Sequence, residues 1–260
     1  MILDELAAHA RERVAAARAR VPLEEIRAQA EALPRGDFRF EKALAGKGTA
    51  FICEIKKASP SRGVIDPQFD YIGIAGQYEE AGADCISVLT EPKWFLGSDD
   101  IFRAVRLTVD APMLRKDFTV DAYQIYEARV LGADAVLLIC ALLDTDTLRE
   151  YLAICDRLGL SALVETHDEA EMQSAVAAGA RLIGVNNRNL RDFSVDLGNA
   201  ARLCAGAPEG TIFVAESGVS CPEDAAKLRQ AGADAILVGE YLMRSPDKQG
   251  ALQALREAAK

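Results

Sequence analysis

The sequence has few of the residues that hold metal ions. It contains only two histidines and no HxxxH pattern. Its six cysteines are scattered, and none forms a CxxC pair (Cys53, Cys85, Cys140, Cys155, Cys204, Cys221). Protein metal sites draw on histidine, grouped cysteine or grouped acids. We therefore predict no metal, and expect the cysteines to be small apolar side chains in a reducing compartment rather than disulfide partners.

Long apolar runs are also missing. The longest that we find spans residues 135–143, between Asp134 and Asp144, whereas a membrane-spanning helix needs about 20 apolar residues. No basic segment with an apolar core opens the chain, so no signal peptide is expected. These absences predict a soluble, cytoplasmic protein.

Positively charged residues are fewer than negatively charged ones. The chain has 30 Lys and Arg and 40 Asp and Glu, for a formal net charge of −10. That balance argues against nucleic acids and anionic membranes as partners. An anionic substrate would need a local cluster of Lys and Arg.

Residues 1–48 differ in composition from the rest of the chain. They are rich in Ala, Arg and Glu, with sparse apolar positions and two segments of helical character, the second beginning near Pro22 and ending at Pro34. We expect a helical N-terminal extension that packs on the main domain, because Ile26 and Leu33 need cover. The 260 residues, half of them hydrophobic, suit one domain.

From Ala50 onward, short runs rich in Val, Ile and Leu alternate with helical segments. Such runs are typical of parallel strands that are buried on both sides. We predict eight strands, at residues 50–56, 84–89, 112–116, 135–140, 161–165, 181–186, 211–216 and 235–239.

A repeated pattern supports this count. A glycine that ends a helix is followed by Ala and a strand at four places, and each interval holds two strand–helix units (Gly82, Gly132, Gly179, Gly232). Eight such units predict a (β/α)8 barrel. The competing fold is an open doubly wound sheet, but no GxGxxG turn follows the first strand.

Charged side chains cluster where the predicted strands end. Glu54 and Lys56 are two residues apart and so share one face of the first strand. Lys116, Glu165 and Glu216 end three other strands. Functional groups of a barrel come from these ends, and burying so many charges without a purpose is costly. We therefore predict an acid/base site here.

The ends of strands seven and eight suggest a phosphate site. Ser217, Gly218, Gly239 and the N–H of Glu240 are candidates, because backbone N–H groups at this place commonly bind phosphate in barrels. Lys56 and Arg188 could complete the site, and Ser59 lies on the loop after strand one. Phe95 and Phe118 are candidate walls for an aromatic substrate. His167 lies at the start of a helix, where we interpret it as a capping residue.

The motifs "CEIKKASPSRG", "MLRKDFTVDAYQIYEAR", "LVETHDEAE", "IGVNNRNLRDFSVD", "AESGV" and "LVGEYLM" closely resemble those of the indole-3-glycerol phosphate synthase family. The resemblance runs from about Phe51 to Met243. It implies ring closure, decarboxylation and dehydration of 1-(o-carboxyphenylamino)-1-deoxyribulose 5-phosphate, without a cofactor, in tryptophan biosynthesis.

The resemblance also implies a role for each matching position. Lys116 resembles the general acid of the family, and Glu165 resembles its acid/base or charge-stabilising counterpart. Glu54 and Lys56 resemble residues that support these two and the dehydration step. The remaining positions resemble contacts to the substrate and its phosphate (Ser59, Asn186, Arg188, Glu216, Ser217, Gly218, Gly239, Glu240). A phosphosugar isomerase and a non-catalytic phosphate-binding barrel stay open as alternatives. We expect a monomer whose partner is a phosphorylated small molecule.

The loop after the first strand, residues 57–70, should move as a lid, since Gly63 and short polar residues suit mobility. We predict fast amide hydrogen exchange in this loop, slowed when a product analogue binds. Exchange at the same rate with and without the analogue would exclude a lid.

Overall fold

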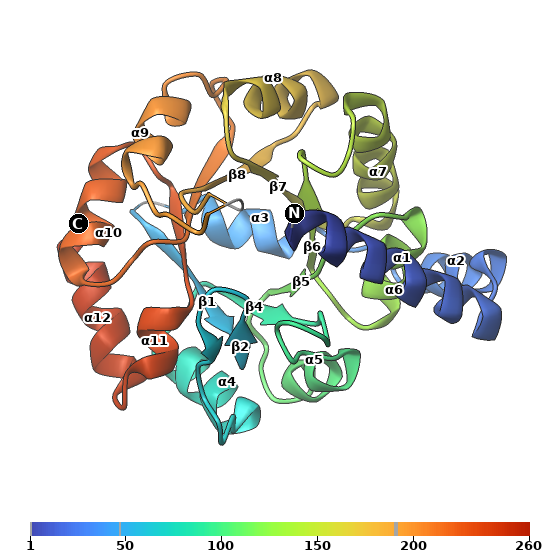
Figure 1. Ribbon diagram of the computed structural model, residues 1–260, viewed down its shortest axis with the longest axis horizontal. Coiled ribbons are helices and arrows are strands. Elements are labelled where there is room, and N and C mark those ends of the chain that lie inside the picture. Colours follow the sequence, from blue (N-terminus) through green and yellow to red (C-terminus); the bar gives the residue numbers. More distant parts are fainter. Residues whose placement is uncertain (1, 47, 190–191) are drawn as a thin grey trace.

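The computed structural model of the protein describes residues 2–46, 48–189 and 192–260. Eight parallel strands close into a barrel in the order β1-β10-β9-β8-β7-β6-β5-β4 (Figure 1). The predicted (β/α)8 barrel is confirmed, and each strand lies within one residue of its predicted bounds. The strands are β1 Ala50–Ile55, β4 Cys85–Leu89, β5 Met113–Lys116, β6 Ala135–Ile139, β7 Ser161–Thr166, β8 Leu182–Asn186, β9 Ile212–Glu216 and β10 Ala235–Val238.

Helices follow the strands and form an outer ring (Figure 1). They are α4 Tyr71–Glu80, α5 Asp99–Arg106, α6 Ala122–Val130, α7 Thr145–Leu158, α8 Glu169–Ala178, α9 Gly198–Cys204, α10 Pro222–Gln230, α11 Glu240–Arg244 and α12 Lys248–Ala258. The four repeated glycines all have left-handed φ angles between 79° and 96°, as a helix-ending role requires. Within the described ranges, no helix has the length and hydropathy that a membrane crossing needs.

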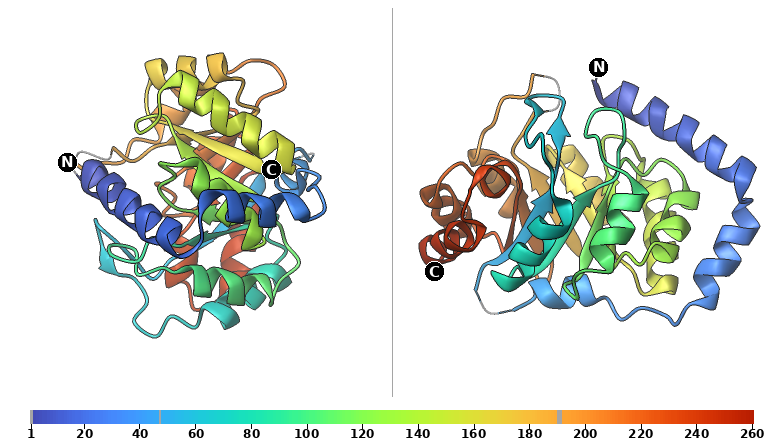
Figure 2. Two further views of the ribbon diagram at one scale, coloured as in Figure 1. Left: turned by 90° about the vertical axis from the view of Figure 1, so that its right-hand side faces the viewer. Right: turned by 90° about the horizontal axis from the view of Figure 1, so that it is seen from below.

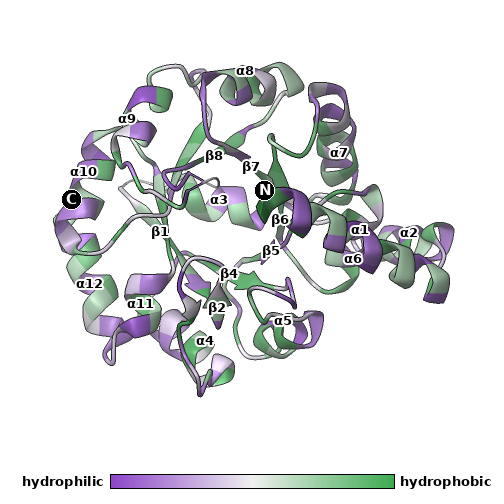
Figure 3. Ribbon diagram, viewed as in Figure 1, coloured by the Kyte–Doolittle hydropathy of each residue, from purple (hydrophilic) through white to green (hydrophobic). Residues whose placement is uncertain are grey.

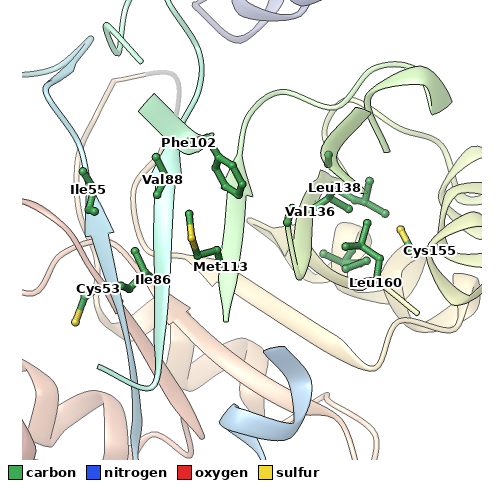
Figure 4. Close-up of a cluster of buried hydrophobic side chains, with 14 of the residues drawn as sticks. Cys53, Ile55, Ile86, Val88, Phe102, Met113, Val136, Leu138, Cys155 and Leu160 are labelled. Atoms are coloured by element: carbon green, nitrogen blue, oxygen red, sulfur yellow. The ribbon is translucent and has the colours of Figure 1, made fainter. Parts of the chain in front are cut away.

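The strands have two apolar faces. One face packs against the surrounding helices, with Ile86 and Val88 of β4 beside Phe102 of α5 (Figure 4). The other face points into the barrel, where a second cluster contains Ile52, Leu114 and further inward side chains. Apolar residues therefore run along the strands, while polar residues gather on the helices and loops (Figure 3).

The inward-facing side chains change from apolar to acidic along three of the strands. On β1, Ala50 and Ile52 belong to the inner apolar cluster, and Glu54 follows two residues later. On β7 and β9 the inward residues Leu163 and Val214 are likewise followed by Glu165 and Glu216. The same period of two that fills the barrel with apolar side chains thus delivers charged ones to its carboxyl end.

The N-terminal residues wrap around the outside of the barrel (Figure 2). Helix α1, Ile2–Arg20, lies over the carboxyl end of the strands, and α2, Leu23–Ala32, packs on α6. Met1 and Lys47 of the predicted extension lie outside the described residues. Ile26 is buried as expected, but Leu33 is 40% exposed, so the expectation that Leu33 needs cover was wrong.

A third helix, α3 at Arg39–Leu44, was not predicted. Its Phe40 and Leu44 are fully buried in the inner cluster. They close the amino end of the barrel, opposite α1 (Figure 2). Helix α3 has only six residues, and so short a helix gives little periodic signal in a sequence.

The loop of residues 57–70 contains an unpredicted antiparallel hairpin of β2, Ala58–Ser59, and β3, Gly63–Val64. Gly63 takes a left-handed φ of 64° at its turn. Ile65 and Phe69 after the hairpin are buried, so only its tip is free of the core.

Ion pairs tie α1 to the barrel. Arg13 donates two hydrogen bonds to the buried carboxylate of Asp117, at 2.9 and 2.6 Å. His9 lies 3.0 Å from Glu91, whose carboxylate also accepts three backbone N–H groups of the loop after β4. Since Asp117 directly follows Lys116, the anchor of α1 lies beside the charged barrel end.

Arg13→Ala should destabilise the protein by about 2 kcal/mol or more, because it leaves Asp117 buried without its main cationic partner. Arg18→Ala is the matched control. It removes an exposed pair between α1 and Asp121 and should cost less than about 1 kcal/mol. Urea denaturation of the three proteins measures both values. Equal losses would show that the Arg13 pair does not anchor α1.

Candidate active site

A cavity opens at the carboxyl end of the barrel. Every predicted site residue except Gly218 lines it. The cavity brings together Glu54, Lys56, Ser59, Phe95, Lys116, Phe118, Glu165, Asn186, Arg188, Glu216, Ser217, Gly239 and Glu240. Gly218 instead lines an adjoining cleft, which shares Arg188 and Glu240 with the cavity. Residues that lie far apart in the sequence thus meet around one space.

Lys116 is the centre of the charged group. Its Nζ lies 3.4 Å from Glu165 Oε2 and 3.4 Å from Glu216 Oε2. Both carboxylates are almost completely buried. One ammonium therefore faces two carboxylates in a region from which most water is excluded.

These contacts move the pKa values of the three groups apart. Burial alone lowers the pKa of Lys116, but Glu216, Glu165 and Glu54 outweigh it and raise this pKa above its ordinary value. Burial likewise raises the pKa of Glu165, yet Lys116, His167 and a hydrogen bond from Asn186 produce a net lowering. Lys116 stays protonated and Glu165 stays ionised.

Glu216 behaves differently from Glu165, although both contact Lys116. Burial and the nearby charges of Glu165 and Glu54 raise the pKa of Glu216 to about 8, against the opposing effect of Lys116. Its Oε1 accepts no hydrogen bond from any described residue. Glu165 has His167 and Asn186 as further partners, so the charge of Glu165 is stabilised more strongly than that of Glu216.

The pair on the first strand occupies the neighbouring part of the cavity. Lys56 Nζ donates to Glu54 Oε1 at 2.6 Å, so the two side chains share one face as predicted. Gly239 lies against them: a Cβ there would be 2.6 Å from Glu54 Oε1 and 3.0 Å from Lys56 Nζ. A glycine at the end of β10 therefore makes room for the pair.

The chain makes a tight turn after β9. Ser217 and Gly218 both have left-handed φ angles, of 65° and 95°. A Cβ on Gly218 would lie 2.6 Å from Val195, so the turn needs glycine on two grounds. Successive residues of this kind present backbone N–H groups to an anion.

Cations surround this turn. Arg188 lines both the cavity and the adjoining cleft. Arg62, from the hairpin loop, lies 3.3 Å from the carboxylate of Glu240, which Arg244 also contacts at 3.0 Å. Arg62 was not among the predicted site residues, since a single Arg in a loop gives no signal of its own.

Aromatic and apolar side chains form the opposite wall. The rings of Phe95 and Phe118 lie 6.0 Å apart at an interplanar angle of 42°. Leu6 and Leu3 of α1 line the same cavity, and neither was predicted to do so. Contacts between the first residues of the chain and the strand ends are not encoded by any local pattern.

Gly184 is a further residue that the sequence did not single out. It faces the barrel interior on β8, and a Cβ there would meet Glu216 Oε1 at 2.1 Å. Gly184 is thus what allows Glu216 to turn toward Lys116. Among the described residues, no group of three or more His, Cys, Asp and Glu side chains could hold a metal ion.

The sequence pattern of one family matches residues 3–255, and its description is "Indole-3-glycerol phosphate synthase". The chain belongs to the indole-3-glycerol phosphate synthase family. A synthase of this name from Ruminiclostridium cellulolyticum is 54% identical over the whole of both chains. Another, from Leuconostoc mesenteroides, is 48% identical over 98% of this chain and 99% of its own. The predicted resemblance to this family is confirmed.

More distant solved structures share the fold. A 3-hexulose-6-phosphate synthase superposes with a TM-score of 0.64 at 18% identity, over 82% of this chain and all of its own. The tryptophan synthase alpha subunit of Legionella pneumophila gives a TM-score of 0.60 at 15% identity, over 85% of this chain and 98% of its own. At such identities the likeness concerns the barrel alone.

The raised pKa of Glu216 predicts a pH-dependent stability. The neutral carboxyl stabilises the fold fully below its unfolded pKa of about 4.5, and that stabilisation is lost as pH rises through about 8. Glu216→Gln cannot ionise, so its free energy of unfolding should increase relative to wild type between pH 5 and pH 9. Urea denaturation across this range tests the prediction, with the exposed Glu209→Gln as control. A constant difference for Glu216→Gln would contradict it.

Proposed function

We propose that the cavity at the carboxyl end of the barrel performs the synthase reaction of the family, with Lys116 as the proton donor. The substrate is 1-(o-carboxyphenylamino)-1-deoxyribulose 5-phosphate, and the products are indole-3-glycerol phosphate, CO2 and water. The observation that carries the proposal is the ammonium of Lys116 between two buried carboxylates on the cavity wall. The family match supports this reaction over the phosphosugar isomerase and the non-catalytic barrel considered from the sequence.

The two ends of the cavity suit the two ends of this substrate. The turn at Ser217 and Gly218, with Lys56, Arg188 and the N–H of Glu240, takes the phosphate. Ser59, on strand β2 of the hairpin, lines the same cavity. Phe95 and Phe118 hold the aromatic ring. Fixing both ends bends the chain so that the ring carbon bearing the carboxylate reaches the ketone.

Ring closure needs a proton on the ketone oxygen. Lys116 donates it as the new carbon–carbon bond forms, because the oxygen then becomes far more basic than a ketone. The raised pKa of Lys116 keeps that proton in place until such a strong acceptor develops. The ring becomes a cation, which the carboxylate of Glu165 stabilises.

Decarboxylation and dehydration complete the reaction. The substrate carboxylate leaves as CO2, and its bonding electrons restore the aromatic ring. The new hydroxyl then leaves as water after a second protonation, and a proton is removed from the carbon beside the nitrogen. Glu54 and Lys56 support Lys116 and Glu165 in this step, and Asn186 and Glu216 contact the substrate.

We further propose that the protein acts as a monomer in the cytoplasm and needs no cofactor or metal. The direct assay is indole fluorescence after the ketose phosphate is added to the purified chain with a chelator present. Fluorescence should increase with time at the same rate with and without chelator. No increase would overturn the proposed function.

Lys116→Arg separates proton donation from positive charge. Arginine keeps the charge but is a poor donor at neutral pH, since its pKa lies above about 12. General acids contribute roughly 10²–10⁴-fold, so Lys116→Arg and Lys116→Met should each lose at least about a hundredfold in kcat. Lys42→Met, on an exposed pair at the other end of the barrel, is the control and should keep kcat.

Thermal melting checks that each variant is folded. A Lys116→Arg variant that keeps kcat within about tenfold of wild type, while Lys116→Met does not, would make Lys116 an electrostatic clamp rather than a donor. Lys56 would then be the donor to test.

A further inference from the structure

His167 connects the buried carboxylate of Glu165 to a second carboxylate. Its Nδ1 lies 3.0 Å from Glu171 Oε2, and its Nε2 lies 3.4 Å from Glu165 Oε1. Glu171 also accepts the backbone N–H of His167 at 2.8 Å, so α8 fixes the ring. The sequence-based interpretation as a helix cap was wrong, because Asp168 caps α8. The reaction steps above use Glu165 but leave His167 without a role.

The contact between His167 and Glu165 requires a shared proton. When Nδ1–H donates to Glu171, a neutral imidazole presents the lone pair of Nε2 to Glu165. Two acceptors would then face each other inside the protein. The contact is favourable only when either Nε2 or Glu165 Oε1 carries a proton, and these two states are the ends of one proton transfer.

The second oxygen of Glu165 continues the path. Oε1 faces His167 at 3.4 Å, and Oε2 faces the ammonium of Lys116, also at 3.4 Å. The carboxylate of Glu165 therefore lies between the imidazole of His167 and the ammonium of Lys116, and it contacts both. A proton that arrives on Oε1 reaches Lys116 when the neutral carboxyl group rotates and turns its O–H toward Nζ.

The two ends of this path lie in different spaces. Glu165 and Lys116 line the reaction cavity, whereas His167 and Glu171 line a separate polar cleft beside it. The cleft and cavity share only Leu3, Asn186 and Arg188 of the described residues. His167 thus connects Glu165 to the polar cleft by a route that does not cross the substrate cavity.

The titratable and charged groups around His167 are mostly acidic. They comprise Glu165 of β7, Glu171 and Asp168 of α8, Glu216 of β9, Cys140 after β6, and, along the cleft, Asp4, Asp196, Arg188 and Arg202. Burial alone lowers the pKa of His167, but the hydrogen bond to Glu171 and the charges of Glu165, Glu171 and Glu216 outweigh it and raise this pKa. The ring is therefore suited to carry a proton near neutral pH.

The proposed reaction needs a supply of protons. The oxygen receives two protons in each turnover, one at ring closure and one as water leaves. Only one proton is removed, from the carbon beside the nitrogen. CO2 leaves without a proton, so each turnover takes up one proton from water.

We propose that His167 relays this proton from the polar cleft through Glu165 to Lys116. The Nε2–H bond of His167 breaks as Glu165 Oε1 gains the proton. The neutral carboxyl group then rotates about its Cγ–Cδ bond, so that this O–H faces the amine of Lys116, and the O–H bond breaks as Lys116 Nζ gains the proton. Water in the cleft returns a proton to His167. The relay rests on the proposed roles of Lys116 and Glu165, and His167 acts through them without touching the substrate.

His167→Gln and His167→Asn test the relay, because each retains a hydrogen-bonding group but cannot carry a proton at neutral pH. Each should lower steady-state kcat at least about tenfold, with KM within about twofold of wild type. In a single turnover with enzyme in excess, CO2 release should keep the wild-type rate, since Lys116 begins protonated. Indole formation, which follows the second protonation, should slow. Added imidazole should restore kcat in proportion to its concentration.

Two results would overturn the relay. One is a kcat within about twofold of wild type for both variants from pH 6 to pH 9. The other is an equal slowing of CO2 release and indole formation that imidazole does not relieve, which is the mark of a structural role. Thermal melting confirms folding. Activity retained in Lys116→Met would instead overturn the proposed function, whatever the His167 variants do.

Glu171→Gln provides a second variant that leaves His167 in place. Loss of the Glu171 charge lowers the pKa of His167, so the decline of kcat with rising pH should begin at a lower pH than in wild type. An unshifted pH profile would contradict the relay.

Discussion

The attraction between one ammonium and the carboxylates around it determines the arrangement of this site. Lys116 is held 3.4 Å from both Glu165 and Glu216 in a region with little water. Removing such charges from water is costly, and the cost is recovered only when every partner is closely placed. Gly184 and Gly239 serve that placement, because a side chain at either position would collide with a carboxylate of the group.

The alternation of side chains along the barrel strands places these charged groups close together. Alternate side chains of the strands face inward, and on β1, β7 and β9 they are apolar at the amino end and acidic at the carboxyl end. Gly184 and Gly239 leave the space that Glu216 and Glu54 occupy. The unequal partners of the two carboxylates then give Glu165 and Glu216 opposite pKa shifts, so that one residue type supplies both a stronger and a weaker acid.

Much of this arrangement could be predicted from the sequence. Apolar strand runs and repeated glycines indicated the barrel, and the rule that strand ends carry function brought Glu54, Lys116 and Glu165 together in advance. Other parts have no local signal. Helix α3 is too short to show a period, and the position of α1 over the cavity depends on contacts such as Arg13 with Asp117, about a hundred residues apart.

The role of single side chains was harder still to predict. Gly184 resembles any strand glycine until Glu216 is seen beside it. His167 follows Glu165 by two residues, a spacing that suggests one face of a strand, yet β7 ends at Thr166 between them. Only the fold shows that its ring joins Glu165 to a separate cleft.

The ionisation of Lys116 tests the account most directly. Nitrogen-15 NMR of the protein labelled at lysine Nζ would follow this ammonium as pH is raised, with Lys116→Met to assign its signal. We predict that Lys116 remains protonated beyond the ordinary lysine pKa of about 10.4, and that Glu165→Gln makes it titrate at a lower pH. A Lys116 that loses its proton below about pH 9 in the wild-type protein would contradict the account.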